Sequence, residues 1–148
     1  MRRLAVILLA LLPLSATAQD SAPPTVPFQP LNAAEVTLGD YLWLARPVVV
    51  FADAAADPRF VQQMELLAET PEALAERDVV VIIDTDPKAM TSVRTKLRPR
   101  GFMMVIMDKD GSVVLRKPVP WSIREITHAI DKLPLRKEEL LRGRTATH

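Results

Sequence analysis

The most informative absence in this 148-residue sequence is cysteine, of which there is none. Without a thiol the chain cannot carry out thiol–disulfide exchange, supply a thiolate nucleophile or build a cysteine-ligated zinc site. Disulfide bonds cannot hold it together either, so its stability has to come from a packed core. Lipid attachment to an N-terminal cysteine is excluded for the same reason.

Glycine and histidine are scarce as well, with four and two copies. So few glycines do not form a glycine-rich phosphate-binding loop. His148 lies in a polar tail, and His128 is expected on the exposed side of a helix, so neither has a partner at metal-ligand spacing. We therefore expect no metal and no cofactor.

Apolar runs long enough to cross a bilayer are also missing. The longest, residues 4–14, is shorter than the roughly 20 residues that a membrane-spanning helix needs. It follows two arginines and precedes small residues at 16–18, an arrangement typical of a secretory signal peptide rather than a membrane anchor. We predict that residues 1–18 are removed near Ala18-Gln19 and that the rest is exported, to the periplasm or the medium.

Charge of one sign is not in excess. Loss of the leader takes the 19 basic residues to 17 against 18 acidic ones, which argues against nucleic acid as a partner. Residues 19–37 begin QDSAPPTVPFQP, have no apolar periodicity and are predicted to be an extended tether. Residues 38–142 are expected to form one domain, and residues 143–148 a polar tail.

Within that domain, apolar stretches alternate with helix signals. Continuous or nearly continuous β-branched and apolar runs predict strands. Asp-Pro, Thr-Pro and Ser starts predict helices, because these residues cap a helix and proline suits its first turn. The predicted strands are 47–52, 78–84, 102–107 and 112–117, and helices are expected from Asp57, from Thr70, over 87–97 and from Ser122, with one basic turn after Pro134.

The resulting order is β-α-β-α-β-β-α. Two crossovers give parallel pairing, and the DKDG turn between the last two strands adds an antiparallel hairpin. We predict an α/β domain with a mixed sheet of about four strands and helices on both faces, the order of the thioredoxin fold. Trp43 and Met90 are expected in its core.

Four stretches of the domain are distinctive: LGDYLWLARPVVVFA, LAERDVVVI, DKDGSVVLR and IDKLPLRKEEL. Together they resemble a bacterial family, the thioredoxin-like domain of unknown function number 4174, which is related to C-terminal domains of animal extracellular sushi-repeat proteins. The resemblance implies the fold but no activity, since the family has none established. The residues that carry it are Arg46, Arg77, Asp110, Gly111, Arg116, Asp131, Pro134, Arg136 and Glu139.

The first candidate site is the loop in VVVFADAAADPRF. Thioredoxins hold a thiolate at this junction, where the N–H groups and dipole of a helix stabilise negative charge. Here the loop offers Asp53, three alanines and Asp57. We interpret Asp57 as the helix cap, which occupies the donors that a bound anion would need, and Asp53 as a loop residue. An acid–base pair of these two carboxylates is the alternative.

The second candidate is IIDTDPKAMT, in which Asp84 and Asp86 follow a strand. This resembles phosphotransferases that form an aspartyl phosphate and hold magnesium between two acids. However, Lys88 stands where those enzymes have threonine or valine, and their further motifs are missing. We interpret the two aspartates as turn and cap residues before Pro87.

The third candidate is a basic run that includes Arg94, Lys96, Arg98 and Arg100. It could bind an anion, but we favour a solvated helix end whose cations complement the helix dipole. Trp121 is expected at the rim near the opening loop, where it either anchors a partner or packs on the sheet edge.

These observations predict a binding or accessory protein of the cell envelope rather than an enzyme. Its contact surface is expected where loop 53–59, loop 98–101 and Trp121 converge, and its partner to be an envelope protein or a small ligand. One alternative is an antioxidant-related or hydrolytic enzyme that pairs Asp57 or Asp53 with one of the two arginines of the second loop.

A third possibility is a structural role in the envelope. It would be mediated by the basic C-terminal turn around Arg136 and Arg142.

Overall fold

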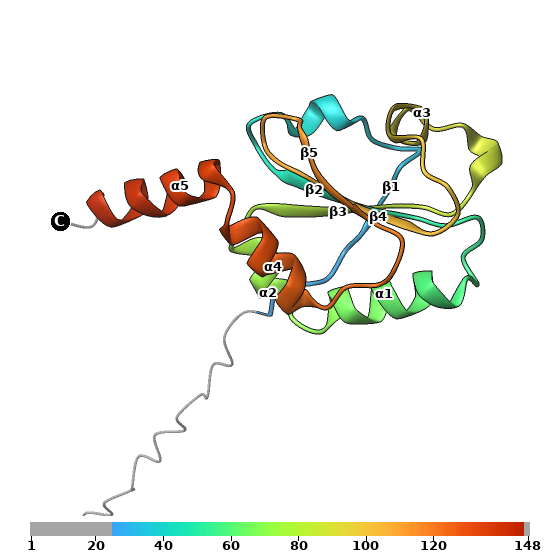
Figure 1. Cartoon of the computed structure of the whole chain (residues 1–148), viewed down its shortest axis with the longest axis horizontal. Helices are drawn as coiled ribbons and strands as arrows, with labels where there is room; N and C mark the ends of the chain where they lie inside the picture. Colours follow the sequence, from blue (N-terminus) through green and yellow to red (C-terminus); the bar gives the residue numbers. More distant parts are fainter. Residues whose placement is uncertain (1–24, 147–148) are drawn as a thin grey trace, which may run out of the picture.

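A five-stranded mixed sheet runs through the centre of the computed structural model, which describes residues 25–146 (Figure 1). The strand order is β1-β3-β2-β4-β5. The strands are β1 (Leu31–Asn32), β2 (Arg46–Phe51), β3 (Val79–Asp84), β4 (Met103–Met107) and β5 (Val113–Lys117).

Pairing follows from the connections. The β1, β3 and β2 strands are parallel, because helical crossovers return the chain in the same direction, whereas β4 and β5 run antiparallel to their neighbours. All six residues of β2 are buried, and for residues 47–51 the continuous apolar run predicts this for a central strand. The mixed sheet of the predicted thioredoxin-like order is confirmed, with five strands in place of four.

Helices cover both faces of the sheet. Side chains alternate along β2, so Val48 and Val50 enter one apolar cluster while Val49 and Phe51 enter the other. In Figure 1 α1, α2 and α4 lie on one side, and η1 and α3 on the other. The helical elements are η1 (Leu38–Tyr41), α1 (Pro58–Ala68), α2 (Pro71–Ala75), η2 (Pro87–Ala89), α3 (Ser92–Leu97), α4 (Ile123–Asp131) and α5 (Pro134–Thr145).

The edge strand β1 lies within the segment expected to be a tether. Leu31 and Asn32 pair with Ile82 and Ile83 of β3, and Ala33 is only 2% exposed. The extended tether therefore ends before residue 31. A strand of two residues leaves no periodicity in the sequence, which is why it was missed.

Helix 87–97 is two pieces rather than one. Met90 separates η2 from α3, has a left-handed backbone (φ 46°) and is 68% exposed, so its expected burial is wrong. Asp86 caps the first piece, accepting from the backbone N–H of Lys88, and Thr91 caps the second. The helix is divided because each of these caps binds the backbone N–H groups at the start of a separate helical piece.

The C-terminal helix α5 is longer than the single turn expected after Pro134. None of its twelve residues is buried, and Figure 1 shows it extending away from the sheet. No helix among residues 25–146 is long and apolar enough to span a membrane.

Candidate functional site

The loop after β2 ends at Asp57, which caps α1 as predicted. Its Oδ1 accepts a hydrogen bond from the backbone N–H of Arg59 at 2.9 Å. The Arg59 side chain also binds this carboxylate, with Nε 3.2 Å from Oδ1 and Nη2 2.9 Å from Oδ2. The side-chain hydrogen bond from Arg59, followed by the backbone one, lowers the pKa of Asp57. The anion position at this helix start is therefore filled by the chain's own carboxylate.

The rest of this loop is a small exposed surface. Asp53 and the alanines 54–56 are all exposed, and the backbone N–H of Asp57 donates to the Ala54 carbonyl at 3.1 Å. Asp53 makes no side-chain hydrogen bond or ion pair with any residue in the range 25–146. The loop therefore presents alanine methyl groups and the carboxylate of Asp53 to the solvent.

A buried ion pair lies behind the loop, at the carboxyl ends of β2 and β3. Arg94 donates to Asp84 Oδ1 through Nη2 at 2.8 Å and Nε at 3.1 Å, and to the carbonyl oxygen of Ala52 at 3.0 Å. Thr91 Oγ1 donates to Asp84 Oδ2 at 2.7 Å. Burial alone raises the pKa of Asp84, but the bonds from Arg94 and Thr91 outweigh it and lower that pKa.

This pair corrects two interpretations of the sequence. Arg94 is 9% exposed and is not part of a solvated basic face, and Asp84 is more than a turn residue. The pair joins β3, α3 and the end of β2, so it supports the loop from below. Both side chains already bind each other, which leaves Asp84 unsuited to form a covalent phosphate.

Arg98 and Arg100 differ from Arg94. Both are exposed, and within the described part of the chain their side chains form neither a hydrogen bond nor an ion pair. No contact therefore joins them to Asp53 or Asp57. Their loop does meet α1, because the guanidinium carbon of Arg59 lies 5.5 Å from the centre of the Phe102 ring.

Trp121 is tied to the middle of α1. Its backbone N–H donates to Gln63 Oε1 at 2.9 Å, and its carbonyl accepts from Gln63 Nε2 at 2.8 Å. The fully buried Gln63 side chain thus satisfies both backbone polar groups of Trp121, which lies in the connection between β5 and α4. The ring is partly buried against the core, and Lys117 Nζ lies 4.4 Å from its centre.

The three segments expected to form a contact surface lie at one end of the sheet. Figure 1 shows the β2–α1 loop and the α3–β4 loop there, and the β5–α4 segment starts at the same end and runs back along α1 to α4. Two contacts join these segments to α1, that of Arg59 with Phe102 and that of Gln63 with Trp121, and neither was predicted from the sequence. The sequence gives little indication of these contacts, because the two residues of each pair are far apart along the chain.

The opposite end of β2 holds a larger ionic cluster centred on Arg46. This side chain is 0% exposed, and its Nε donates to Asp108 at 2.9 Å. Nη1 donates to the Arg77 carbonyl at 3.0 Å and to Glu139 at 3.1 Å, and Nη2 donates to Glu139 at 2.9 Å. One guanidinium therefore links the end of β4, the α2–β3 connection and α5.

Glu139 receives a second cation. Lys109 Nζ lies 2.9 Å from Glu139 Oε1 and 2.7 Å from Asp78 Oδ2. Burial raises the pKa of Glu139, but the bonds from Arg46 and Lys109 outweigh it and lower that pKa from 4.5 to about 2. This carboxylate anchors α5, a helix without a fully buried residue, to the sheet.

A neighbouring pair continues the cluster towards α4. Arg77 binds Asp131 in two places, at 2.9 and 2.8 Å, and also donates to the Ala73 carbonyl. Arg136 lies 3.5 Å from both Asp131 and Glu139, and its buried Nε has no partner with hydrogen-bond geometry. Five of the nine residues that carry the family resemblance therefore contact one another here. These contacts were not predicted from the sequence.

The other four lie outside this cluster. Asp110 accepts from the N–H and hydroxyl of Ser112 in the hairpin turn. Gly111 has φ 83°, and a Cβ at its position would lie 2.9 Å from Leu42 Cδ2. Arg116 donates to the Leu97 carbonyl, and Pro134 is the first residue of α5.

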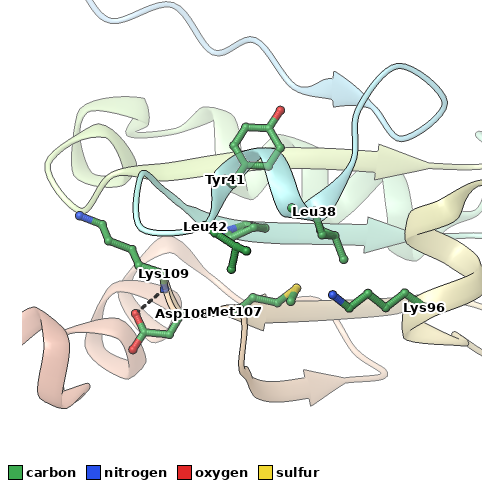
Figure 2. A pocket seen from close by; sticks show the side chains of 10 residues that line it. Leu38, Tyr41, Leu42, Lys96, Met107, Asp108 and Lys109 are labelled. Carbon is green, nitrogen blue, oxygen red and sulfur yellow. Dashed lines mark hydrogen bonds between the residues drawn. The ribbon is translucent and has the colours of Figure 1, made fainter.

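A hollow between η1 and the end of β4 is shown in Figure 2. Its volume is about 30 Å³, room for about one water molecule and not for a substrate. Among residues 25–146 no group of three or more His, Asp or Glu side chains is placed to hold a metal ion. The hollow is lined by residues that include Leu38, Tyr41, Leu42, Lys96, Met107, Asp108 and Lys109.

Comparison with known proteins settles the family. The model of the Domain of unknown function (DUF4174) matches residues 37–139. The chain belongs to this family. A search of curated proteins finds no match.

Two solved structures show the fold of this DUF4174 domain. A reduced 2-Cys peroxiredoxin of Plasmodium vivax is 13% identical, with a TM-score of 0.55 over 70% of this chain and 85% of that one. A chloroplastic thioredoxin z is 20% identical, with a TM-score of 0.54 over 72% of this chain and 96% of that one. At such identity the likeness establishes a thioredoxin-like fold and no shared chemistry.

Proposed function

We propose that this DUF4174 domain is an exported, non-enzymatic binding protein of the cell envelope. Its contact surface is the end of the sheet formed by the β2–α1 loop, the α3–β4 loop and Trp121. The residues that would meet the partner are Asp53, Asp57, Arg98, Arg100 and Trp121. The partner would be an envelope protein or a small ligand.

The observation that carries the proposal is the self-filled helix start at Asp57. In a chain without cysteine, the place that thioredoxins use for a thiolate is occupied by a carboxylate with bonds to Arg59. Exposed alanines precede it, and the exposed Arg98 and Arg100 belong to the loop whose Phe102 contacts Arg59. A fixed loop with nearby cations favours recognition over reaction.

The enzymatic alternative lacks this support. A general base needs a pKa near the working pH, whereas the bonds from Arg59 lower the pKa of Asp57. In the described structure neither Asp53 nor Asp57 is hydrogen-bonded or ion-paired to Arg98 or Arg100. We therefore do not assign a reaction to this loop.

Export is tested by fractionating cells that produce the full chain and determining the N-terminus of the mature protein by mass spectrometry. We expect the protein in the periplasm or medium, starting at Gln19. Intact protein that starts at Met1 and remains in the cytoplasm would refute this part of the proposal. The predicted leader, residues 1–18, lies outside the described residues.

Binding is tested by capture from envelope extracts with the wild type and with Arg98→Gln/Arg100→Gln. The matched control is Arg124→Gln/Lys132→Gln, which removes two exposed cations from α4 and its C-terminal end instead. We expect a partner that the wild type and the control retain and the Arg98/Arg100 variant loses. Identical partners for all three proteins would overturn the surface assignment.

A further inference from the structure

Three consecutive large apolar residues are exposed in the turn between η1 and β2. Leu42, Trp43 and Leu44 are 45%, 66% and 70% exposed. The expected core position of Trp43 is therefore wrong. Single exposed apolar side chains are ordinary, but adjacent ones in a soluble domain indicate a contact surface.

The backbone holds this turn in its exposed shape. The N–H of Trp43 donates to the Lys109 carbonyl at 2.7 Å, and the N–H groups of Leu44 and Ala45 donate to the Tyr41 carbonyl at 3.0 Å. Trp43 has φ 62°, a left-handed conformation that bulky residues rarely adopt. Such strain persists where the surrounding structure fixes it, and it often marks a functional segment.

The helix α5 lies next to this turn across an open groove of about 270 Å³. Four of the six side chains that line the groove are charged, so it is a poor pocket for an apolar side chain of another protein. The apolar groups form instead a tip beside the groove. The lining residues are Trp43, Lys109, Leu135, Glu138, Glu139 and Arg142.

The charge of α5 is predominantly positive. Its sequence, PLRKEELLRGRT, contains four basic and two acidic residues. One of the acids, Glu139, is neutralised by Arg46 and Lys109. The basic residues Lys137, Arg142 and Arg144 are exposed, together with Leu140 and Leu141.

We propose that the turn 42–44 and α5 bind the surface of a membrane that contains anionic lipids. Tryptophan favours the interface between lipid headgroups and acyl chains, and leucine gains by leaving water. Cations near the surface add attraction to anionic headgroups, and peripheral attachment needs both contributions to be stable. A protruding apolar tip beside a basic helix provides both. This surface is at the opposite end of β2 from the proposed partner surface, so the membrane proposal and the proposed function can be refuted independently of each other.

Intrinsic fluorescence gives a direct test, because the chain has only two tryptophans. In Trp121→Phe the emission reports Trp43 alone, and in Trp43→Phe it reports Trp121 alone. The chain from Gln19 is used, because it contains every described residue and lacks the apolar leader. With phosphatidylglycerol vesicles we expect a blue shift and quenching by brominated lipid in Trp121→Phe and neither in Trp43→Phe.

Leu44→Asp should weaken vesicle binding by about tenfold, the loss expected for one leucine side chain that no longer leaves water. Met90→Asp is the matched control, since Met90 is 68% exposed at the other end of the molecule and should have no effect. Circular dichroism checks that every variant is folded. Absence of a Trp43 shift with anionic vesicles would overturn the proposal in favour of a protein partner, and an equal shift with phosphatidylcholine would refute the role of α5.

Discussion

A buried arginine lies at each end of β2: Arg46, its first residue, and Arg94 of α3, which contacts the chain just after its last residue. The two arginines connect different parts of the chain. Arg94 binds Asp84, ten residues away, and so joins α3 to the end of β3, the strand that precedes it. Arg46 binds Asp108 and Glu139, which are 62 and 93 residues away. The first arginine supports a loop, whereas the second joins the hairpin and the C-terminal helix to the sheet.

This difference indicates a division of roles. At the Arg46 end, five of the residues that carry the family resemblance bind one another and hold the chain's elements together. At the Arg94 end, the buried pair lies beneath a loop whose neighbours Arg98 and Arg100 have no ionic partner within residues 25–146. Stability is expected to depend most on the first end, and binding by the loops on the second.

The largest effect is predicted for Arg46→Met. It leaves Asp108 and Glu139 without their buried cation and should lower the free energy of unfolding by about 3–5 kcal/mol. Urea unfolding followed by circular dichroism measures the loss. Arg59→Met, which breaks an exposed ion pair, is the matched control and should cost at most about 1 kcal/mol. Equal losses for the two variants would contradict the comparison.

A smaller loss is predicted for Arg94→Met. Asp84 keeps hydrogen bonds from Thr91 and from the backbone N–H of Asp86, so we expect about 2–3 kcal/mol in the same unfolding experiment. Adding Asp84→Asn should restore part of the stability, because it removes the unpaired buried charge. If the double variant is less stable than Arg94→Met, the unpaired charge of Asp84 is not the cause of the stability loss.

Acid should weaken the Arg46 end in a defined range of pH. The pKa of Glu139 is lowered from 4.5 to about 2, so its contribution to stability is present above pH 4.5 and is lost as the pH falls towards 2. Glu139→Gln should therefore be less stable than the wild type at neutral pH, and the difference should shrink in acid. Unfolding curves at several pH values measure this difference. A difference that does not change with pH would show that the Glu139 carboxylate is not the source of the acid sensitivity.

The smallest effect is predicted for Asp57→Ala. Loss of the cap should cost about 1 kcal/mol, and Asp57→Asn should cost less because asparagine also caps helices. Thermal unfolding of both variants tests this. A much larger loss in Asp57→Ala would mean that Asp57 does more than cap α1.

The sequence predicted local features well. The strands β2 to β5 and the starts of α1, α2 and α4 follow from apolar runs and cap residues, which act over a few positions. One turn after Pro134 was predicted, but not the full length of α5, because this helix has no apolar face and is attached through ion pairs such as those of Glu139.

Long-range contacts were not predictable from one sequence. Arg46 stands beside an apolar strand without any local sign that Asp108 and Glu139 will neutralise it. Arg94 looks like a member of a solvated basic run, yet the turn of α3 directs it under the loop. The resemblance named most of the residues at the Arg46 end, but not their contacts.

Site-specific crosslinking tests the division of roles most directly. A photoreactive residue replaces Ala55 in the exposed loop or, as a control, Lys132 at the other end, and intact cells are irradiated. The account predicts a discrete adduct from position 55 that disappears in Arg98→Gln/Arg100→Gln while the unfolding free energy changes by less than about 0.5 kcal/mol. No adduct at position 55, or one that the double variant retains, would contradict it.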